Sequence, residues 1–372
     1  MKVVIVTPYW LQTKGGITSA VYHLSERLML KGHSVLVITT DRGSGAVGLP
    51  KNRFVATFHL LRLLQKFCPD IVHVHACGFL LLASVLYKIL LNHSVNLIFT
   101  FHTQPHTFSF LKEKPARERG CLRQFLFNYL IRHCDVTTYV SRSLMSSLDK
   151  TGVKIVRPVI IPNGVEVKFV SKEHVIHFKQ KYDIGDGFPI LCMIAKFEWD
   201  WKVKGIQILI RAVRQVVKSQ QKAKLLIVGD GRYRKLLEDY VQKECLEKQV
   251  VFTGNLDNPY IALASCSIYC HISLNEALGI APLEAMAMGK PVVVSNDMGL
   301  PEIVSDGING ILVDSTSDSV AKAILNLSGN SNLMHQLSKN ARITAATKFS
   351  WEKIAARYEN IYQGNLSKCQ KD

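Results

Sequence analysis

Two carboxylates lie close together in an otherwise apolar stretch, SLNEALGIAPLEAMAMGKPVVVS, which covers residues 273–295. Glu276 and Glu284 are separated by seven mostly apolar or small residues. A carboxylate removed from water is costly unless a partner pairs with it. The spacing therefore indicates a ligand, and carboxylates can hold the vicinal hydroxyls of a ribose or another sugar through charge-assisted hydrogen bonds.

Glycines that precede predicted helices could bind a phosphate group. Gly15 and Gly16 lie just before one such helix, and GIAPLEAMAMG predicts another that begins near Gly279 and places Glu284 in its second turn. Backbone amides at a helix N-terminus, with the helix dipole behind them, favour an anion. Neither stretch matches GxGxxG or GxxxxGK(S/T), so neither a dinucleotide site nor a P-loop is indicated.

Three lysines could bring positive charge to the same ligand. Lys204 stands with Gly205 at the start of a further predicted helix, and Lys196 and Lys202 precede it. A lysine and two helix N-termini that converge on one place can neutralise a diphosphate. Surface lysines are common, so Lys204 taken alone fits binding and solvation equally well.

Apolar strands that alternate with helices must position these residues. Strands are predicted over residues 2–7, 34–40, 70–75, 96–101 and 135–141 in the first half, which the apolar run at residues 156–165 closes, and over 189–195, 223–231, 250–254, 266–273 and 290–295 in the second. Continuous apolar strands separated by helices indicate a parallel sheet covered on both faces. The fold class is therefore α/β, with two successive Rossmann-like, doubly wound domains.

The residues singled out lie at one end of these strands. Ligands of doubly wound sheets bind beyond the carboxyl ends of the strands. His102, Gly229, Gly254 and Glu276 each follow an apolar strand run at its carboxyl end. Two such domains that face each other would form a cleft, and these residues would line it.

The domain boundary is predicted within IPNGV, because Asn163-Gly164 is a turn dipeptide. Residues 1–163 and 164–372 then form the two domains, as expected for a chain of 372 residues, which exceeds what one core usually serves. The last helix, at about residues 350–364, is expected to pack back towards the N-terminal domain, with its aromatic residues in the core.

The positive charge of the chain is concentrated in the first half. The formal net charge is +17, and residues 1–163 hold 20 Lys and Arg against 7 Asp and Glu, whereas residues 164–372 hold 26 against 22. A basic half suggests a polyanion, an anionic membrane surface or a phosphorylated substrate.

The N-terminus and the cysteines indicate a cytoplasmic protein. KVVIVTPYW reads as a strand rather than a signal peptide, and the most apolar run, FLLLASVLYKILL, is too short to span a bilayer and fits a buried helix. The nine cysteines are odd in number and scattered without a CxxC pair, which favours reduced thiols. The chain is expected to be soluble, or peripheral on the cytoplasmic face of a membrane.

Taken together, these motifs resemble glycosyltransferase family 4, whose members are retaining enzymes of GT-B fold that use nucleotide sugars. The resemblance covers nearly the whole chain, in the order and spacing of that family, and the E-x7-E element followed by GKPVV is its most specific part. It rests on Gly15-Gly16, His102, IPNGV, Lys204-Gly205, VGDG, EALGIAPLEAMAMGKPVVVS, GLPEIV and DGINGILV.

The resemblance implies a donor site around the two glutamates. Glu284 corresponds to the glutamate that binds the ribose hydroxyls of the nucleotide, and Glu276 to the one near the transferred sugar. The backbone amides of Gly279, Ile280 and Ala281 would face sugar and phosphate.

The resemblance also implies partners for the diphosphate and the reacting sugar. Lys204 matches the lysine that holds the leaving diphosphate, and Gly16, beside Gly15, matches an amide of the N-terminal domain that meets the same group. His102 matches the histidine at the reacting side of the sugar. Gly229 and Gly254 are assigned to the donor loops, and His102, Glu276 and Lys204 to catalysis.

One departure from the family leaves the diphosphate clamp open. The family usually has arginine at the position of Lys196, and lysine cannot make the bidentate grip of arginine. The FEWDWKV stretch between Lys196 and Lys204 is longer than the family's loop, so Lys202 is an alternative for that position.

The implied chemistry is transfer of a hexose-type sugar with retention of anomeric configuration. Negative charge develops on the leaving nucleoside diphosphate, and lysines and helix N-termini can stabilise it without a metal ion or another cofactor. HVH at residues 73–75 lacks a third ligand in sight, which disfavours a metal site. The expected setting is the synthesis of a cell-surface polysaccharide or a glycolipid.

A basic and aromatic segment after His102 suggests how the acceptor is bound. In FLKEKPARERGCLRQFLFNYLIRHC, basic residues alternate with phenylalanines, which suits anionic lipid headgroups. A solvated loop followed by a core helix fits equally well, and no nucleic-acid-binding module accompanies the segment. We therefore expect a lipid-linked or saccharide acceptor on the N-terminal domain, opposite a donor on the C-terminal domain, and no nucleic acid. The basic residues are Lys112, Lys114, Arg117, Arg119 and Arg123.

Other functions are compatible with parts of the sequence. A nucleotide-sugar epimerase can share the two-domain architecture, but the E-x7-E block argues against it. A non-catalytic sugar-nucleotide binder is disfavoured because His102, Lys204 and both glutamates are present. An NAD oxidoreductase lacks its glycine fingerprint.

Overall fold

The computed structural model describes residues 1–10, 15–41, 43, 45–75, 77–103, 120–185 and 187–366, with the side chains of residues 120–123 left aside. The chain forms two compact units. Unit 1 comprises Met1–Gly164 and Trp351–Asp372, and unit 2 comprises Val165–Ser350.

Unit 1 is built on a parallel sheet of seven strands in the order β3-β2-β1-β4-β5-β6-β7. The chain starts in the middle of the sheet, runs outward to one edge and returns to lay β4 beside β1, so the sheet is doubly wound. The strands are β1 (Lys2–Thr7), β2 (Ser34–Thr39), β3 (Val47–Gly48), β4 (Ile71–Val74), β5 (Asn96–Phe101), β6 (Val136–Tyr139) and β7 (Pro158–Ile160).

Helices cover this sheet, and most connect successive strands. They are α1 (Gly16–Leu30), α2 (Arg53–Phe67), α3 (Phe79–Leu90), α4 (Gly120–Arg132), α5 (Arg142–Lys150) and α13 (Trp351–Tyr362). The apolar run predicted to be a buried helix is α3, which buries residues such as Leu81 and Tyr87.

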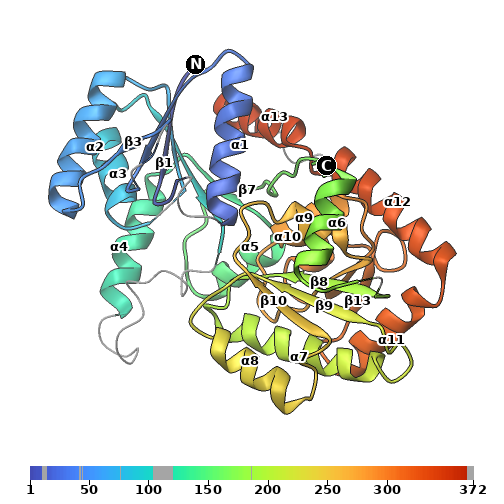
Figure 1. Ribbon diagram of the computed structural model, residues 1–372. Helices are drawn as coiled ribbons and strands as arrows, with labels where there is room; N and C mark the ends of the chain where they lie inside the picture. The colour runs from blue at the N-terminus through green and yellow to red at the C-terminus, as the bar shows by residue number, and fades with distance from the viewer. Residues whose placement is uncertain are drawn as a thin grey trace. The chain divides into compact units, whose positions relative to one another are not determined.

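The last helix belongs to unit 1, where α13 lies beside α1 (Figure 1). Its three large aromatic side chains, Trp351, Tyr358 and Tyr362, are buried in the same apolar cluster as Ile5 and Leu24. Ion pairs close the contact at the surface, because Lys31 Nζ lies 2.7 Å from Glu359 Oε2 and Arg27 Nε lies 3.1 Å from Glu352 Oε1. The prediction that these aromatic residues are core is confirmed.

Unit 2 contains a second parallel sheet, of six strands in the order β10-β9-β8-β11-β12-β13. The strands are β8 (Ile190–Ile194), β9 (Lys224–Val228), β10 (Val250–Gly254), β11 (Ile268–His271), β12 (Val292–Ser295) and β13 (Ile311–Val313). The helices are α6 (Lys172–Lys181), α7 (Asp200–Val216), α8 (Arg234–Lys243), α9 (Tyr260–Ser265), α10 (Ile280–Ala287), α11 (Ser317–Ser328) and α12 (Ser331–Lys348), with a 3-10 turn, η3 (Leu300–Glu302).

The two parallel sheets confirm the predicted α/β class and the doubly wound architecture. The alternation of apolar runs located the other strands but missed two at sheet edges. These are β3, with two residues, and β13, with three, which are too short to produce a periodic apolar pattern.

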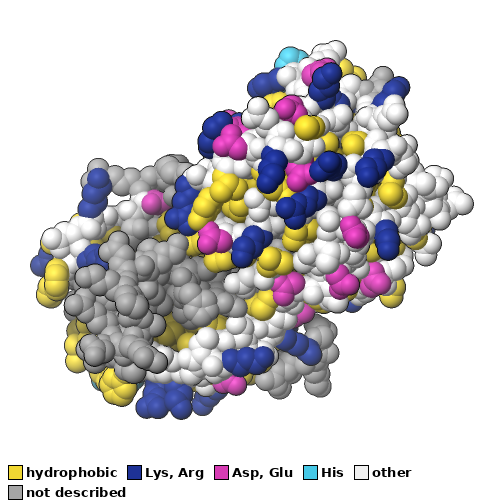
Figure 2. Space-filling view, turned by 90° about the horizontal axis from the view of Figure 1, so that it is seen from below, with side chains coloured by type: hydrophobic (Ala, Val, Ile, Leu, Met, Phe, Trp, Pro, Cys, Tyr) yellow, Lys and Arg dark blue, Asp and Glu magenta, His cyan; other side chains and the backbone are white. Residues whose placement is uncertain are grey.

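The surface of unit 2 carries charges of both signs. Figure 2 shows Lys and Arg interspersed with Asp and Glu over the side of α7 and α8. Several of them pair, such as Arg214 with Glu244 at 2.9 Å and Lys235 with Asp239 at 2.8 Å. This mixture fits the nearly balanced charge of the second half of the chain.

Candidate functional site

The order of the strands in unit 2 explains why two distant segments meet. The chain leaves β8 for β9 and β10 on one side and then returns to lay β11 on the other side of β8. The loops after β8 and β11 therefore leave the sheet side by side, at the switch point where doubly wound sheets bind ligands. The first loop leads into α7 with Lys202, and the second carries Glu276.

At this switch point Glu276 is held by two cationic or polar side chains. Its Oε2 accepts a hydrogen bond from Lys202 Nζ and lies 2.9 Å from His271 Nε2. Burial alone would raise the pKa of Glu276, but the Lys202 charge and the hydrogen bonds from His271 and Lys202 hold it well below its usual range. Glu276 is therefore a carboxylate at every physiological pH.

His271 holds Glu276 through a hydrogen bond, and it is not among the residues predicted from the sequence. Its Nδ1 lies 3.1 Å from the hydroxyl of Tyr269, so the ring bridges this hydroxyl and the carboxylate. Burial, followed by the nearby Lys202 charge, lowers the pKa of His271. A neutral ring that donates from Nε2 to Glu276 can accept the Tyr269 proton at Nδ1. Tyr269 and His271 lie two residues apart on β11 and thus on one face, which is the signal that could have indicated them.

Glu284 lies in the second turn of α10, as predicted, and its surroundings differ from those of Glu276. The Tyr260 hydroxyl donates to Glu284 Oε1 at 3.0 Å. Burial raises the pKa of Glu284 to about 7, although the Tyr260 hydrogen bond lowers it in part. One carboxyl group of the pair is thus fully ionised, and the other is balanced between its two forms near neutral pH.

The N-terminus of α10 begins after Gly279, as predicted, because this residue adopts φ 94°. This positive φ favours glycine, and a Cβ here would also stand 2.8 Å from Leu300 Cδ2. The backbone N–H groups of the first turn, including those of Ile280 and Ala281, have no partner within the helix and can bind an anion.

The helix that carries Lys202 and Lys204 begins earlier than the sequence indicated. α7 starts at Asp200 rather than at Lys204, so half of the FEWDWKV stretch is helical and Lys202 lies in its first turn. Lys202 turns towards Glu276, whereas Lys196 and Lys204 are exposed. The boundary was wrong because Trp199, the residue before the helix, makes no side-chain cap that sequence could reveal.

Gly205 explains how α7 comes so close to β11. A Cβ at this position would stand 1.9 Å from the backbone oxygen of Ile272, the residue after β11. The helix therefore rests directly on the backbone that leads to Glu276, and this close approach brings Lys202 to the carboxylate.

Gly229 follows β9 and Gly254 is the last residue of β10, and backbone geometry accounts for both. Gly229 N donates to Gly254 O at 2.9 Å, with φ 127° and φ 70° at the two residues. A Cβ at Gly229 would stand 1.9 Å from the backbone oxygen of Ala195, the residue after β8. These glycines therefore allow the close backbone packing beside the switch point.

In unit 1, Gly15 and Gly16 begin α1, as predicted. Gly15 is the residue before the helix, and its carbonyl accepts a hydrogen bond from Ser19 N at 3.0 Å. Both glycines are exposed, which leaves the first amides of the helix accessible.

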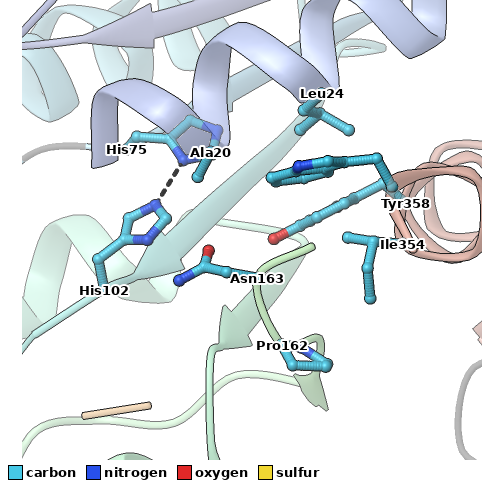
Figure 3. Close-up of a pocket in the computed structure, with 9 residues that line it drawn as sticks. Ala20, Leu24, His75, His102, Pro162, Asn163, Ile354 and Tyr358 are labelled. Atoms are coloured by element: carbon cyan, nitrogen blue, oxygen red, sulfur yellow. Dashed lines mark hydrogen bonds between the residues drawn. The ribbon is translucent and has the colours of Figure 1, made fainter. Parts of the chain in front are cut away.

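His102 follows β5 and is buried, with 8% of its surface exposed. Its Nε2 lies 2.8 Å from Nδ1 of His75, which follows β4, and the two rings stack with centroids 5.1 Å apart. Burial lowers the pKa of His102 to about 4. Figure 3 shows the two rings joined by this bond beside a cavity that Asn163 and Tyr358 also line. The cavity measures about 10 Å³, roughly the space of one water molecule.

The first histidine of HVH, His73, has a structural environment. Its Nδ1 lies 2.7 Å from the Tyr362 hydroxyl and its Nε2 lies 2.6 Å from Thr100 Oγ1. Within the part of the chain that the structure describes, no group of three or more His, Cys, Asp or Glu is arranged to hold a metal ion.

The predicted acceptor residues Lys112, Lys114, Arg117 and Arg119 lie outside the described residues, and so does the side chain of Arg123. Exposed apolar residues lie on α2 and α4 instead. Phe54, Val55 and Phe58 project from α2, with 82%, 53% and 69% of their surfaces exposed, and Phe125 projects from α4. No helix in the described ranges is long and apolar enough to cross a membrane.

Two family models match the chain. "Glycosyltransferase Family 4" matches residues 14–169, and "Glycosyl transferases group 1" matches residues 176–344. Together they include the residues of both candidate sites, from Gly15 to Glu284.

Curated relatives and a solved structure agree with these models. N-acetyl-alpha-D-glucosaminyl L-malate synthase of Bacillus anthracis is 28% identical, over 82% of this chain and 77% of its own. Alpha-monoglucosyldiacylglycerol synthase of Acholeplasma laidlawii is 24% identical, over 100% and 99%. HepE of Anabaena, crystallised with UDP and glucose, superposes with a TM-score of 0.81 at 19% identity, over 98% of this chain and 100% of its own.

The two matched models lie end to end over the two doubly wound units, and the fold is that of the GT-B structures. The protein belongs to glycosyltransferase family 4 and is a glycosyltransferase.

Proposed function

We propose that the protein transfers a hexose-type sugar, with retention of anomeric configuration, from a nucleoside-diphosphate sugar to an acceptor hydroxyl in glycolipid or polysaccharide synthesis. The observation that carries the proposal is the pair of glutamates at α10. Lys202 and His271 keep Glu276 ionised, and Tyr260 leaves one oxygen of Glu284 to a ligand.

In the proposed donor complex each glutamate holds a different part of one molecule. Glu284 Oε2 accepts from the ribose hydroxyls while Tyr260 occupies Oε1. Glu276 accepts from hydroxyls of the transferred sugar, and the amides of Gly279, Ile280 and Ala281 face the diphosphate between them. A buried site built to pair with hydroxyls discriminates strongly against ligands that lack them.

Lysines and helix N-termini stabilise the leaving diphosphate in this proposal. Lys204 is exposed and free to reach a phosphate, and Lys196 is likewise exposed. Lys202 is already paired with Glu276. The position that is arginine in the family is therefore assigned to Lys196, or to Lys196 and Lys202 together. The amides at Gly15 and Gly16 add a second set of donors. In this proposal no metal ion is needed to neutralise the negative charge that develops on the leaving group.

The proposed transfer relies on the hydrogen-bond donors around the leaving diphosphate. The acceptor oxygen attacks the anomeric carbon on the face from which the diphosphate leaves. The new C–O bond forms as the bond to the β-phosphate oxygen breaks, and the hydroxyl proton passes to that departing oxygen. Glu276 cannot take this proton readily because its pKa is held low by Lys202 and His271 against the effect of burial. Its role is to orient the sugar and to balance positive charge at the anomeric centre.

Unit 1 is proposed to bind the acceptor, which is lipid-linked or a saccharide, and to touch an anionic membrane surface on the cytoplasmic side. The exposed Phe54 and Phe58 of α2 stand beside the exposed Arg53, Arg62 and Lys66 of the same helix. Aromatic residues beside basic ones suit the interface of an anionic bilayer. Relatives named as glycolipid synthases support a lipid acceptor.

A donor panel tests the transferase chemistry. Purified protein is incubated with UDP-, GDP- and ADP-sugars, and the release of nucleoside diphosphate is measured in each case. Release from one base class, abolished in Glu284→Gln, supports the proposal. Silence across the panel for folded protein would favour a non-catalytic binder. With an active donor and a soluble acceptor, the anomeric configuration of the product by NMR tests retention, and a β-linked product from an α-linked donor would exclude it.

Flotation with vesicles tests the membrane contact. Wild-type protein should float with vesicles that contain phosphatidylglycerol and remain behind with phosphatidylcholine alone. Phe54→Ser with Phe58→Ser should abolish flotation. Phe169→Ser in unit 2 removes an equally exposed phenylalanine, 89% exposed, and should leave it unchanged. Equal loss in both variants would contradict a surface on α2.

A further inference from the structure

His75 is a buried histidine that the proposed function does not use, and it makes a direct hydrogen bond to His102. Nδ1 of His75 and Nε2 of His102 lie 2.8 Å apart, at the carboxyl ends of the neighbouring strands β4 and β5. Only 4% of His75 and 8% of His102 are exposed. We propose that His75 is a positioning residue, which holds the His102 ring so that its remaining nitrogen, Nδ1, is presented to the ligand.

The remaining nitrogens of both rings support this assignment. Among the described residues, His102 Nδ1 and His75 Nε2 are buried without a hydrogen-bond partner. A buried polar atom without a partner is costly, so such an atom indicates a water or ligand that completes it. Both rings line the same small cavity, and the side of His102 away from His75 faces Asn163 in Figure 3.

The hydrogen bond couples the proton positions of the two rings. A neutral imidazole carries one N–H, so a bond between two neutral rings uses the hydrogen of one of them. If His75 donates from Nδ1, His102 carries its own hydrogen on Nδ1 and is a donor to the ligand. If His102 donates from Nε2, its Nδ1 is bare and accepts from a hydroxyl. His75 thus lets His102 serve as donor or acceptor without changing its charge.

Both rings are neutral near physiological pH, which this coupling requires. Burial lowers the pKa of His102 to about 4. Burial, together with the neighbouring His73 and His102, lowers the pKa of His75 well below its ordinary value. A pair of this kind is suited to hydrogen bonding with sugar hydroxyls rather than to storing a proton.

The ring of His73 packs beside that of His75. Its ring centroid lies 4.1 Å from that of His75, and its own nitrogens are engaged by Tyr362 and Thr100 at 2.7 Å and 2.6 Å. His73 therefore packs against His75, whereas His102 is joined to it by a hydrogen bond.

Substitutions at His75 distinguish the effect of losing its hydrogen bond to His102 from the effect of losing its packing. The inference rests on the proposed function, in which His102 faces the transferred sugar, and UDP-glucose is the probe. His75→Ala should lower kcat for UDP release on the order of 10- to 100-fold, as misplaced contact groups do. His75→Asn places an amide at the position of Nδ1 and should restore much of this loss. His75→Gln, with its amide one bond further out, should not.

His73→Asn is the matched control, because it removes a buried histidine of the same strand that makes no hydrogen bond to His102. It should lower the thermal midpoint while keeping the wild-type kcat. Equal rescue by His75→Asn and His75→Gln, or a kcat that follows the thermal midpoint across all four variants, would overturn the inference.

A spectroscopic measurement tests the positioning role of His75 without requiring catalytic turnover. Protein labelled with ring-15N histidine is examined by NMR, and the His102 signals are assigned by their loss in His102→Asn. In His75→Ala the His102 ring nitrogens should shift, since Nε2 loses its partner, whereas His73→Asn should leave them in place. Unchanged His102 signals in His75→Ala would refute the positioning role. If UDP-glucose is not turned over, this readout still tests the pair while the proposed donor fails.

Discussion

Tyr260 and Glu284, 24 residues apart, form a hydrogen bond of 3.0 Å from the tyrosine hydroxyl to Oε1. This bond opposes burial, which raises the pKa of Glu284 to about 7. Tyr260→Phe should therefore raise the pKa of Glu284 further and leave less carboxylate at neutral pH. We expect about tenfold weaker UDP-glucose binding near pH 7, in line with the loss of a hydrogen bond to a charged group.

Calorimetric titration across pH checks this prediction. The deficit should shrink in alkaline solution, where Glu284 is ionised with or without Tyr260. Tyr182→Phe, whose hydroxyl donates to Thr253 O in the same unit, is the matched control. A deficit that stays constant with pH would mean that Tyr260 contacts the ligand rather than tuning the glutamate.

The raised pKa of Glu284 also predicts a pH dependence of stability. The folded state binds the proton more tightly than the unfolded state, so this contribution is fully present below pH 4.5 and is lost as pH rises through about 7. Glu284→Gln mimics the protonated form and should be more stable than wild type above pH 7, by up to about 3 kcal/mol. The two proteins should be equally stable below pH 4.5.

Urea unfolding at several pH values measures this difference. Glu247→Gln, an exposed residue of the same unit, controls for the loss of one charge. Glu276→Gln should behave in the opposite way, because the pKa of Glu276 is depressed and its contribution is lost as pH falls. A parallel pH profile for wild type and Glu284→Gln would show that Glu284 is ionised normally.

Lys202 and Lys204 lie two residues apart on α7, but their substitution should affect different properties, the stability of the protein in one case and the binding of UDP in the other. Lys202 and Glu276 are 14% and 19% exposed as side chains, so Lys202→Met leaves a largely buried carboxylate without its cation. We expect a loss of about 3 kcal/mol in the free energy of unfolding. Lys204→Met, at an exposed position, should keep stability and weaken the binding of UDP.

Lys218→Met, exposed beyond the end of the same helix, is the control for both measurements. The contrast assigns the two lysines to different tasks, one to the carboxylate and one to the diphosphate. Identical effects of Lys202→Met and Lys204→Met on stability and UDP affinity would contradict that assignment.

Gly205→Ala should disturb the site by pushing α7 away from the backbone at Ile272. The added Cβ would meet the backbone oxygen of Ile272 at 1.9 Å, and backbone cannot move aside as a flexible side chain does. Overpacking of this kind costs about 1–3 kcal/mol. We expect a lower thermal midpoint and weaker UDP binding, since α7 must lift Lys202 away from Glu276. For the thermal midpoint alone, Lys204→Ala at the exposed adjacent position controls for helix propensity, and an unchanged midpoint in Gly205→Ala would show that the helix can shift freely.

The sequence was sufficient for the fold because apolar strands recur with their helices through nearly the whole chain. It was also sufficient for the position of Glu284, since Gly279 fixes where α10 begins. These features depend on local periodicity and on a residue whose backbone conformation is distinctive.

The contacts within the sites could not be predicted in the same way. Lys202 reaches Glu276 across 74 residues of sequence, and His75 reaches His102 across 27. Such pairs arise from the order of strands in a sheet and from the packing of α7 against β11. The beginning of α7 was misplaced because no polar capping side chain marks it, so Lys202 was not expected in the first turn.

The return of α13 to unit 1 sets the order in which the chain can fold during synthesis. Unit 2 is an uninterrupted segment, whereas unit 1 needs residues from both ends of the described sequence. The apolar surface of α1 that receives Trp351, Tyr358 and Tyr362 stays open until the ribosome has released them. Unit 2 can therefore be finished first, and the nascent N-terminal part of unit 1 must avoid aggregation for some 186 further residues, the length of unit 2 from Val165 to Ser350.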